Sequence, residues 1–243
     1  MKFKSISIAA LAAFTLAGAA NAATTISYSA QTIANSTDTS WVSPAGYTSV
    51  AAFNMGGGTV SFGGLSWFTT NPNAAQNIDT DIDMSFHAPG NAWALNHPSF
   101  YGSSTASTIL NTGNYSGYVS GGVEFRIDLN GFTVGQEYLV QFVLADSRAG
   151  IGVEGRQIGI YGYSSNISGQ DSGNYQYAFG DDRYLVVTAQ FTPSPGDTDF
   201  AFRPGINTGA GLQVNAIQVL TVPEPSAALL GGLGLLALLR RRR

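Results

Sequence analysis

Alternating apolar and polar residues predict β-strands through the C-terminal half of the chain. The clearest alternation covers residues 122–129, where each apolar residue is followed by a polar or charged one: Val123, Glu124, Phe125, Arg126, Ile127, Asp128 and Leu129. A period of two indicates a strand with one buried and one wet face. Asn130 and Gly131 follow it and predict a hairpin turn, which would pair this strand with the next one. Residues 133–136 look like a second turn before that next strand begins.

The segment 137–146 is apolar on both faces, so it predicts a central strand that is covered on both sides. Glycine- and proline-rich breaks separate further expected strands at 157–163, 183–191, 198–202 and 212–221. Weaker patterns predict strands at 51–54, 58–62 and 81–86, and the three tryptophans are expected in loops. No segment between the two ends has helical periodicity. Many short strands with regular turn signals predict an all-β fold, a β-sandwich or jelly roll.

The first residues of the chain have the pattern of a secretory signal peptide. Lys2 and Lys4 are followed by the apolar segment 6–20. Ala20 and Ala22 fit the small-x-small rule for cleavage, which would start the mature chain at residue 23. The pattern therefore predicts a Sec-type export machinery as partner, and the alternative is an N-terminal transmembrane helix.

The last residues form three parts in a fixed order. Val222, Pro223, Glu224 and Pro225 come first, and their prolines favour an extended strip rather than a helix. The uncharged segment 226–239 follows; as a helix it would span about 21 Å, which is short of the roughly 30 Å hydrocarbon core. Four arginines close the chain, Arg240, Arg241, Arg242 and Arg243, and would hold that end in the cytoplasm. A plain weak membrane anchor is one alternative; a buried core helix is another, but it would strand the arginines.

This order of parts resembles the PEP-CTERM sorting signal of Gram-negative bacterial surface proteins. The resemblance implies recognition by an exosortase, a membrane-embedded cysteine transpeptidase-like enzyme that would cut near Pro223, Glu224 and Pro225. Proteins with this signal accompany exopolysaccharide production. The implied course is export, transient anchoring in the inner membrane by the C-terminal helix, and then residence at the cell surface or in the extracellular matrix. The chain then divides into a signal peptide (1–22), a β-sandwich body (23–221) and a sorting and anchor segment (222–243).

The charge of the body differs from that of the whole chain. Both lysines and four of the nine arginines lie in the two ends, so five arginines against 14 acids leave residues 23–221 with a net charge of −9. Such an acidic surface argues against nucleic acid or anionic lipid as a partner. The chain has no cysteine, so an exported body of this size would depend on its hydrophobic core alone.

Part of the body resembles the bodies of other PEP-CTERM proteins. The resemblance rests on the stretch 129–142, on Asp146, Ser147 and Arg148, and on the closing strand 214–219. Those bodies look like carbohydrate-binding jelly rolls, which implies the same fold here and weak glycan binding.

Three groups of residues are candidates for binding or chemistry. Asp79, Asp81 and Asp83 alternate along the chain and are candidate ligands of a structural calcium ion, or else a solvated strand face; no other cofactor is expected. Loop aromatics could stack on sugar rings, and the candidates are Trp67, Trp93, Tyr161 and Tyr163. The acidic pairs Asp181–Asp182 and Asp197–Asp199 are more typical of turns than of glycoside hydrolysis.

Together these patterns predict an exported, non-catalytic surface or matrix protein that associates with exopolysaccharide, by weak glycan binding or in a structural role. A secreted hydrolase acting on polysaccharide is the alternative.

Overall fold

The computed structural model describes residues 23–35, 37–70, 75–76, 82–87, 93–96, 106–116, 126–145, 157–176, 183–206 and 212–222. Nearly all regular structure in these residues is β. The strands are β1 (Ser27–Ile33), β2 (Thr48–Asn54), β3 (Val60–Phe62), β4 (Leu65–Thr69), β5 (Ala75–Gln76), β6 (Asp83–His87), β7 (Trp93–Asn96), β8 (Thr112–Ser116), β9 (Arg126–Asn130), β10 (Tyr138–Leu144), β11 (Gln157–Ser164), β12 (Gln170–Asp171), β13 (Tyr175–Gln176), β14 (Tyr184–Phe191), β15 (Asp199–Ile206), β16 (Leu212–Val214) and β17 (Ala216–Thr221). One helical turn, α1, covers Ser107–Leu110.

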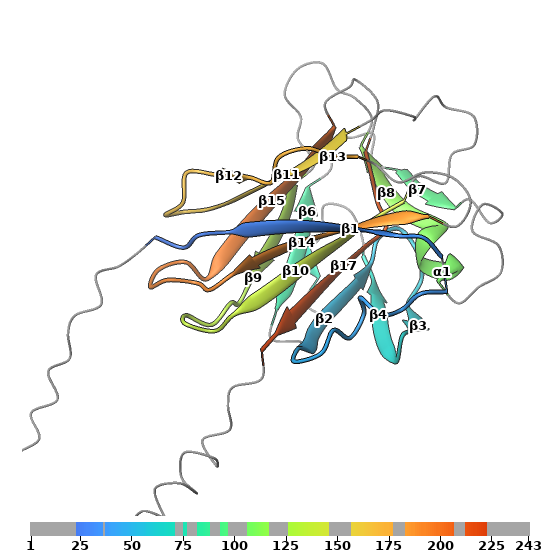
Figure 1. Cartoon of the computed structure of the whole chain (residues 1–243), viewed down its shortest axis with the longest axis horizontal. Helices are drawn as coiled ribbons and strands as arrows, with labels where there is room; N and C mark the ends of the chain where they lie inside the picture. The colour runs from blue at the N-terminus through green and yellow to red at the C-terminus, as the bar shows by residue number, and fades with distance from the viewer. Residues whose placement is uncertain are drawn as a thin grey trace, which may run out of the picture.

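The strands form two large sheets that pack face to face, with a small third sheet beside them (Figure 1). The first sheet has the order β1-β14-β10-β17-β2-β4-β3, in which only the β2–β4 pair is parallel. The second sheet has the order β12-β11-β15-β9-β6-β5, with β13 also paired to β11. The third sheet is β16-β8-β7. The expected β-sandwich is confirmed, and the arrangement is consistent with a jelly roll.

Period-two alternation builds the core between the two large sheets. Alternate residues of β10 and β14 from the first sheet meet alternate residues of β9, β11 and β15 from the second. Aromatic rings dominate the contact; the centroids of Phe191 and Phe200 are 4.3 Å apart, and those of Phe142 and Phe202 are 5.2 Å apart. Burial of such rings is the main favourable contribution to folding in a body without disulfides.

A second apolar cluster covers the opposite face of the first sheet. Val143 of β10 and Val186 of β14 point into it and meet Trp41, Trp67 and other buried side chains. Every residue of β10 is buried, and β10 pairs with β14 on one side and with β17 on the other. The expectation of a central strand covered on both faces is therefore confirmed.

The hairpin expected at Asn130-Gly131 is wrong. β9 pairs with β6 and β15 in the second sheet, whereas β10 lies in the first sheet. Gly131 has φ 101, and its N–H, like that of Phe132, donates to Thr198 O. A two-residue hairpin would keep both strands in one sheet, but the longer segment 131–137 lets the chain cross between sheets. The second expected turn is confirmed, since Gln136 N donates to Thr133 O at 3.2 Å.

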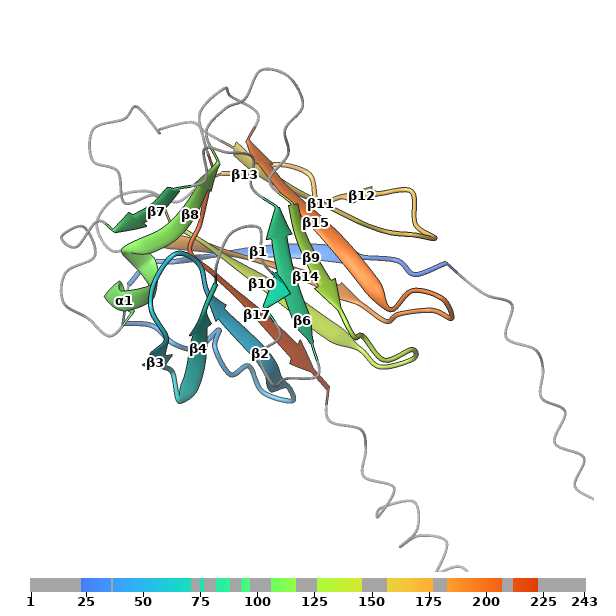
Figure 2. The same cartoon turned by 180° about the vertical axis from the view of Figure 1, so that it is seen from behind.

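The two ends of the described body lie at one end of the sandwich (Figure 1 and Figure 2). Thr24 Oγ1 accepts from Ser194 N and donates to Asp197, both in the β14–β15 connection. That connection is joined to the β9–β10 connection by the bond from Gly135 N to Pro193 O. Val222 N donates to Glu137 O in the latter, and Tyr47 Oη donates to Glu137 as well. We call this surface, made of residues 43–47, 131–137, 192–198 and Val222, the tail end.

Across the part of the chain that the structure describes, no helix is long and apolar enough to cross a membrane. The proposed signal peptide, with Ala20 and Ala22, and the residues from Pro223 to the terminal Arg240, Arg241, Arg242 and Arg243 lie outside the described residues.

Candidate functional site

The outer face of the second sheet carries a polar surface. On β6, β9, β11 and β15 the core takes one set of alternate residues, and the other set points away from it. The register places four of these outward residues in one row across the strands: Ser85, Asp128, Ala201 and Tyr163. A second row contains Asp83, Asn130 and Asp199.

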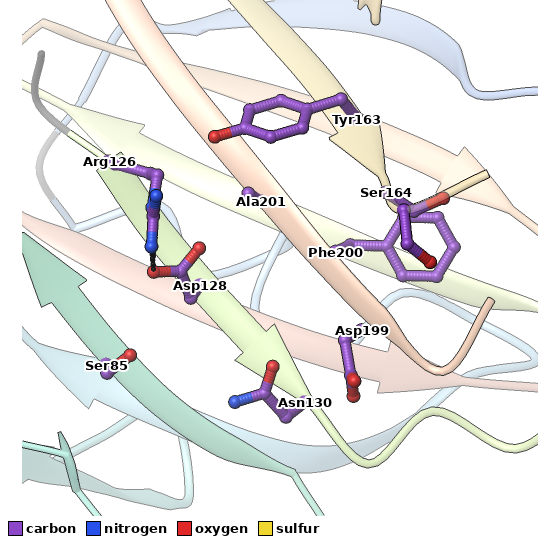
Figure 3. A pocket seen from close by; sticks show the side chains of 10 residues that line it. Ser85, Arg126, Asp128, Asn130, Tyr163, Ser164, Asp199, Phe200 and Ala201 are labelled. Atoms are coloured by element: carbon purple, nitrogen blue, oxygen red, sulfur yellow. Dashed lines mark hydrogen bonds and ion pairs between the residues drawn. The ribbon is translucent and has the colours of Figure 1, made fainter. Parts of the chain in front are cut away.

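An open hollow of about 400 Å³ lies on these rows (Figure 3). It is lined by Ser85, Arg126, Asp128, Asn130, Tyr163, Ser164, Ser165, Asp199, Phe200 and Ala201. β15 lies between β9 and β11, and its outward residue here is the small Ala201. Asp128 of β9 and Tyr163 of β11 stand opposite Ala201 on the two neighbouring strands. The small side chain between larger neighbours accounts for the depression.

An ion pair forms one wall of the hollow. Arg126 and Asp128 lie two positions apart on β9, so both side chains are on the same face. Arg126 Nη2 is 2.8 Å from Asp128 Oδ2, and Nε donates to the same oxygen at 2.9 Å. The hydrogen bond with Asp128 raises the pKa of the Arg126 guanidinium. The wall therefore presents a fixed cation and a fixed anion, with donor and acceptor positions left for a ligand.

Tyr163 lines the opposite side of the hollow, and Tyr161 lies next to it. The ring centroids of Tyr161 and Tyr163 are 6.1 Å apart, and Tyr161 is 39% exposed. Arg203 Nε donates to Tyr163 Oη at 3.0 Å, and its guanidinium carbon lies 4.3 Å from the Tyr163 centroid. These contacts hold the Tyr163 ring in place. A side chain at position 169 would overlap the ring of Tyr161. Because Gly169 has no side chain, the Tyr161 ring can pack against the turn.

The structure places the four aromatic candidates in different surroundings. Tyr161 and Tyr163 lie side by side, and Tyr163 lines the hollow; a ligand contact by either stays a prediction. Trp67 lies in β4 and not in a loop; its side chain is completely buried against Trp41, and its Nε1 donates to Phe62 O at 3.0 Å. The expectation that Trp67 faces a ligand is wrong for this structure, because its apolar surroundings place it in the core. Trp93 lies in β7, and its side chain is outside the described residues.

The candidate calcium ligands are only partly described. Asp83 is in β6, whereas Asp79 and Asp81 lie outside the described residues. Among the residues that the structure does describe, no three acidic, histidine or cysteine side chains are grouped as a metal site would require. The calcium site on Asp79, Asp81 and Asp83 therefore stays a prediction.

The acidic pair Asp197–Asp199 divides between two roles. Asp197 is buried, and its carboxylate accepts hydrogen bonds from the hydroxyls of Thr24, Ser164 and Ser194. Burial alone would raise its pKa, but these hydrogen bonds and that of Asn166 outweigh burial and lower it. Asp199 instead is exposed and lines the hollow. Asp181 and Asp182 lie outside the described residues.

Sequence reasoning did not single out Arg126, Asp128 or Asn130 as site residues. The signal was nevertheless present, because the alternation through residues 122–129 already placed Arg126 and Asp128 on the wet face of a strand. The pairing of β15 with β9 on one side and with β11 on the other brings Tyr163 to the same place, and that pairing is not visible in the local pattern.

Fold and hollow together define a β-sandwich protein with an open polar site on one sheet face. Residues 221–243 match the PEP-CTERM protein-sorting motif, so the chain carries that signal. The motif implies an exported protein sorted by exosortase, with a C-terminus anchored in the membrane before processing. The PEP-CTERM assignment made from the sequence is thus confirmed.

The body has only distant likenesses. No curated protein matches the chain. Among solved structures, the ANXUR1 extracellular domain from Arabidopsis thaliana is 10% identical with a TM-score of 0.42 over 73% of this chain, which spans about half (49%) of that one. The enzymatically active domain of tailspike protein 4 from bacteriophage CBA120 is 8% identical with a TM-score of 0.29, covering 63% of this chain and 22% of that one. A cyclase from Fischerella sp. TAU is 14% identical with a TM-score of 0.30, covering 81% of this chain and 100% of that one.

Proposed function

We propose that the chain is a non-catalytic protein of the cell surface or extracellular matrix, and that its body binds exopolysaccharide in the hollow on the second sheet. Export and sorting bring it to the envelope, where polysaccharide is the abundant polymer. The observation that carries the proposal is that Tyr163 faces the Arg126–Asp128 ion pair across one open depression, with the exposed Tyr161 next to Tyr163.

The chemistry of the hollow suits a sugar. The Tyr163 ring in the lining and the exposed Tyr161 ring beside it offer apolar contact to the C–H face of a pyranose ring, and Arg126, Asp128 and Asn130 offer donors and acceptors to its hydroxyls. The hollow is open rather than enclosed, as a site for a residue inside a long polymer must be. Such a shallow site fits weak binding that gains strength when many copies meet one polymer.

The test measures binding of residues 23–222, which contain every described strand, to a panel of bacterial exopolysaccharides. Tyr163→Ala and Arg126→Ala are each expected to weaken binding about tenfold, equivalent to roughly 1.4 kcal/mol. Tyr47→Ala serves as an aromatic control and Gln190→Ala as a polar control, since Tyr47 lies at the tail end just before β2, Gln190 lies on β14 of the first sheet, and neither lines the hollow. Saturable binding lost only in the hollow variants supports the proposal, whereas equal losses in all four variants, or no binding to any polymer, contradict it.

A hydrolase is a second candidate because Asp128 and Asp199 both line the hollow. They are diagonal neighbours on paired strands, Asp128 opposite Ala201 and Asp199 opposite Asn130, a geometry that puts such residues about 7–8 Å apart. That is within the range for an inverting pair. However, one member must reach the leaving group as general acid, and Asp128 is instead engaged in the ion pair with Arg126. Release of reducing ends from a bound polymer, abolished by Asp199→Asn, would establish the hydrolase instead.

A further inference from the structure

We propose that the tail end of the sandwich rests on the headgroup layer of the membrane while the C-terminal tail is anchored there. The partner is therefore a lipid surface, and it meets a defined surface of the body. The proposal concerns the stage before processing and is independent of what the hollow binds.

The chain leaves the body from a fixed point. β17 is paired on both sides, with β10 and with β2, up to Thr221. Beyond it, Val222 N donates to Glu137 O at 3.3 Å, and Gln136 Nε2 donates to Val222 O at 2.6 Å. Thr221 Oγ1 also donates to Glu137 O at 3.1 Å. The last residue of the body is thus bonded to the tail end and leaves no slack before the sorting motif continues.

The length of the connection limits how far the body can be from the bilayer. Only Pro223, Glu224 and Pro225 separate Val222 from the apolar segment 226–239. Four Cα–Cα steps of 3.8 Å reach about 15 Å at most. One headgroup layer takes up roughly 5–8 Å of that distance. Because an apolar segment of this length is shorter than the hydrocarbon core, it has no residues to spare for a longer connection. The tail end must therefore lie at the headgroups or within about 10 Å of them.

The surface of the tail end suits that position. The body is strongly acidic and would be repelled by anionic lipids. Among residues 43–47, 131–137 and 192–198, however, only Glu137 and Asp197 are acidic and none is basic. Asp197 is buried, and Glu137 is half-buried and accepts a hydrogen bond from Tyr47. Val134 is 43% exposed at the tip of the β9–β10 connection, so this end offers an apolar side chain to the interface.

The N-terminus is compatible with the same orientation. Thr24 is buried against the β14–β15 connection, which belongs to the tail end. Residues 1–22 therefore join the body at the end from which the sorting motif also leaves. A body held with this end toward the membrane does not have to turn over between export and anchoring.

The test uses the full chain, produced without exosortase and reconstituted in vesicles of phosphatidylethanolamine and phosphatidylglycerol (7:3). Because the natural sequence has no cysteine, a spin label can be placed at one position at a time. Val134→Cys labels the tail end. Thr108→Cys is the control: it is exposed on α1, and α1 lies at the opposite end, since Leu110 O accepts from Asn215, the residue before β17 begins. A paramagnetic chelate carried on lipid headgroups reports how close each label is to the bilayer surface.

The relaxation enhancement at position 134 is expected to be at least fivefold that at position 108. Equal enhancement at both positions, or a larger one at 108, overturns the proposal. The same labels on a chain that ends at Val222 test the cause. Loss of the enhancement at 134 supports the tether argument, and an enhancement that persists there without the tail overturns it.

Discussion

At the scale of single residues, the hollow depends on positions where a small side chain is necessary. The small side chain of Ala201 leaves the hollow open between Asp128 and Tyr163. Gly169 lets Tyr161 lie against the turn between β11 and β12, where φ is +40. Neither residue offers a polar group to a ligand, yet both shape the surface that would receive one.

Gly169→Ala is expected to displace the Tyr161 ring and weaken polysaccharide binding about three- to tenfold. The matched control is Gly173→Ala in the same region, where φ is +74 but a Cβ would meet nothing within 4 Å. Both substitutions strain a left-handed backbone, so both are expected to lower the free energy of unfolding by about 1 kcal/mol. Isothermal titration with a polysaccharide bound by the wild type separates the two. Equal binding by both variants would show that the position of Tyr161 does not matter.

Asp197 is expected to make stability depend on pH in the acid range. Its folded-state pKa is lowered, so the stabilisation is present above the unfolded pKa of about 3.9 and is lost as the pH falls through the folded value. Asp197→Asn should therefore lower the free energy of unfolding at pH 7 by about 1–3 kcal/mol, with a difference from wild type that shrinks below about pH 4. Urea unfolding between pH 2.5 and 7 measures it. Asp199→Asn, an exposed substitution two residues away, is the control for a general effect of replacing an aspartate in this region.

At the scale of elements, β17 limits where the tail can be cut. Val219 and Leu220 are completely buried, and the strand is hydrogen-bonded on both sides. A peptidase binds its substrate as a free extended chain, so cutting within β17 would require extracting it from the middle of a sheet.

The processed protein is therefore expected to end at or beyond Val222. The intact mass of the exported protein checks this directly, and a C-terminus before Val222 would contradict it. Replacing Pro223, Glu224 and Pro225 by alanine should leave the full-length, membrane-bound mass. Gln136→Ala, which frees Val222 O and Thr221 Oγ1 from one donor, should leave the processed mass unchanged, because the main-chain pairing of β17 remains.

Strands were predictable where alternation or a buried run was long. The expected segments 137–146, 157–163 and 183–191 correspond to β10, β11 and β14 within about two residues at either end. β1 was missed, because its Ser- and Gln-rich sequence lies exposed at the edge of a sheet and has little apolar signal. β4 was missed as well, because Trp67 was interpreted as a loop aromatic although its neighbours bury it.

The hollow was only half predictable. Tyr161 and Tyr163 could be chosen as exposed aromatics, and alternation set the face of Arg126 and Asp128. What places them together is the pairing β9–β15–β11, which joins segments more than 30 residues apart in sequence. Local patterns contain no information on such pairing, and the wrong hairpin at Asn130-Gly131 shows how a strong local signal misleads when a sandwich requires the chain to change sheets.

At the scale of the whole molecule, charge decides which polymer the body can approach. Residues 23–221 carry a net charge of −9. The charged residues that line the hollow are Arg126, Asp128 and Asp199, and Arg126 is already paired with Asp128. A uronate-rich polymer would be repelled by the body at long range and would find no uncompensated cation cluster at short range.

Neutral polysaccharides are therefore expected to bind at least tenfold more tightly than uronate-rich polymers of similar length. For a neutral polymer, the dissociation constant should change less than twofold between 50 and 500 mM salt, because screening acts on charge–charge contacts and not on stacking or hydroxyl hydrogen bonds. Titrations of both polymer classes across that salt range, with calcium and with chelator, check the expectation. Tighter binding of the uronate polymer that weakens steeply with salt would contradict it. If that preference required calcium, the result would support Asp79, Asp81 and Asp83 as ligands of an ion that bridges the body and the polymer.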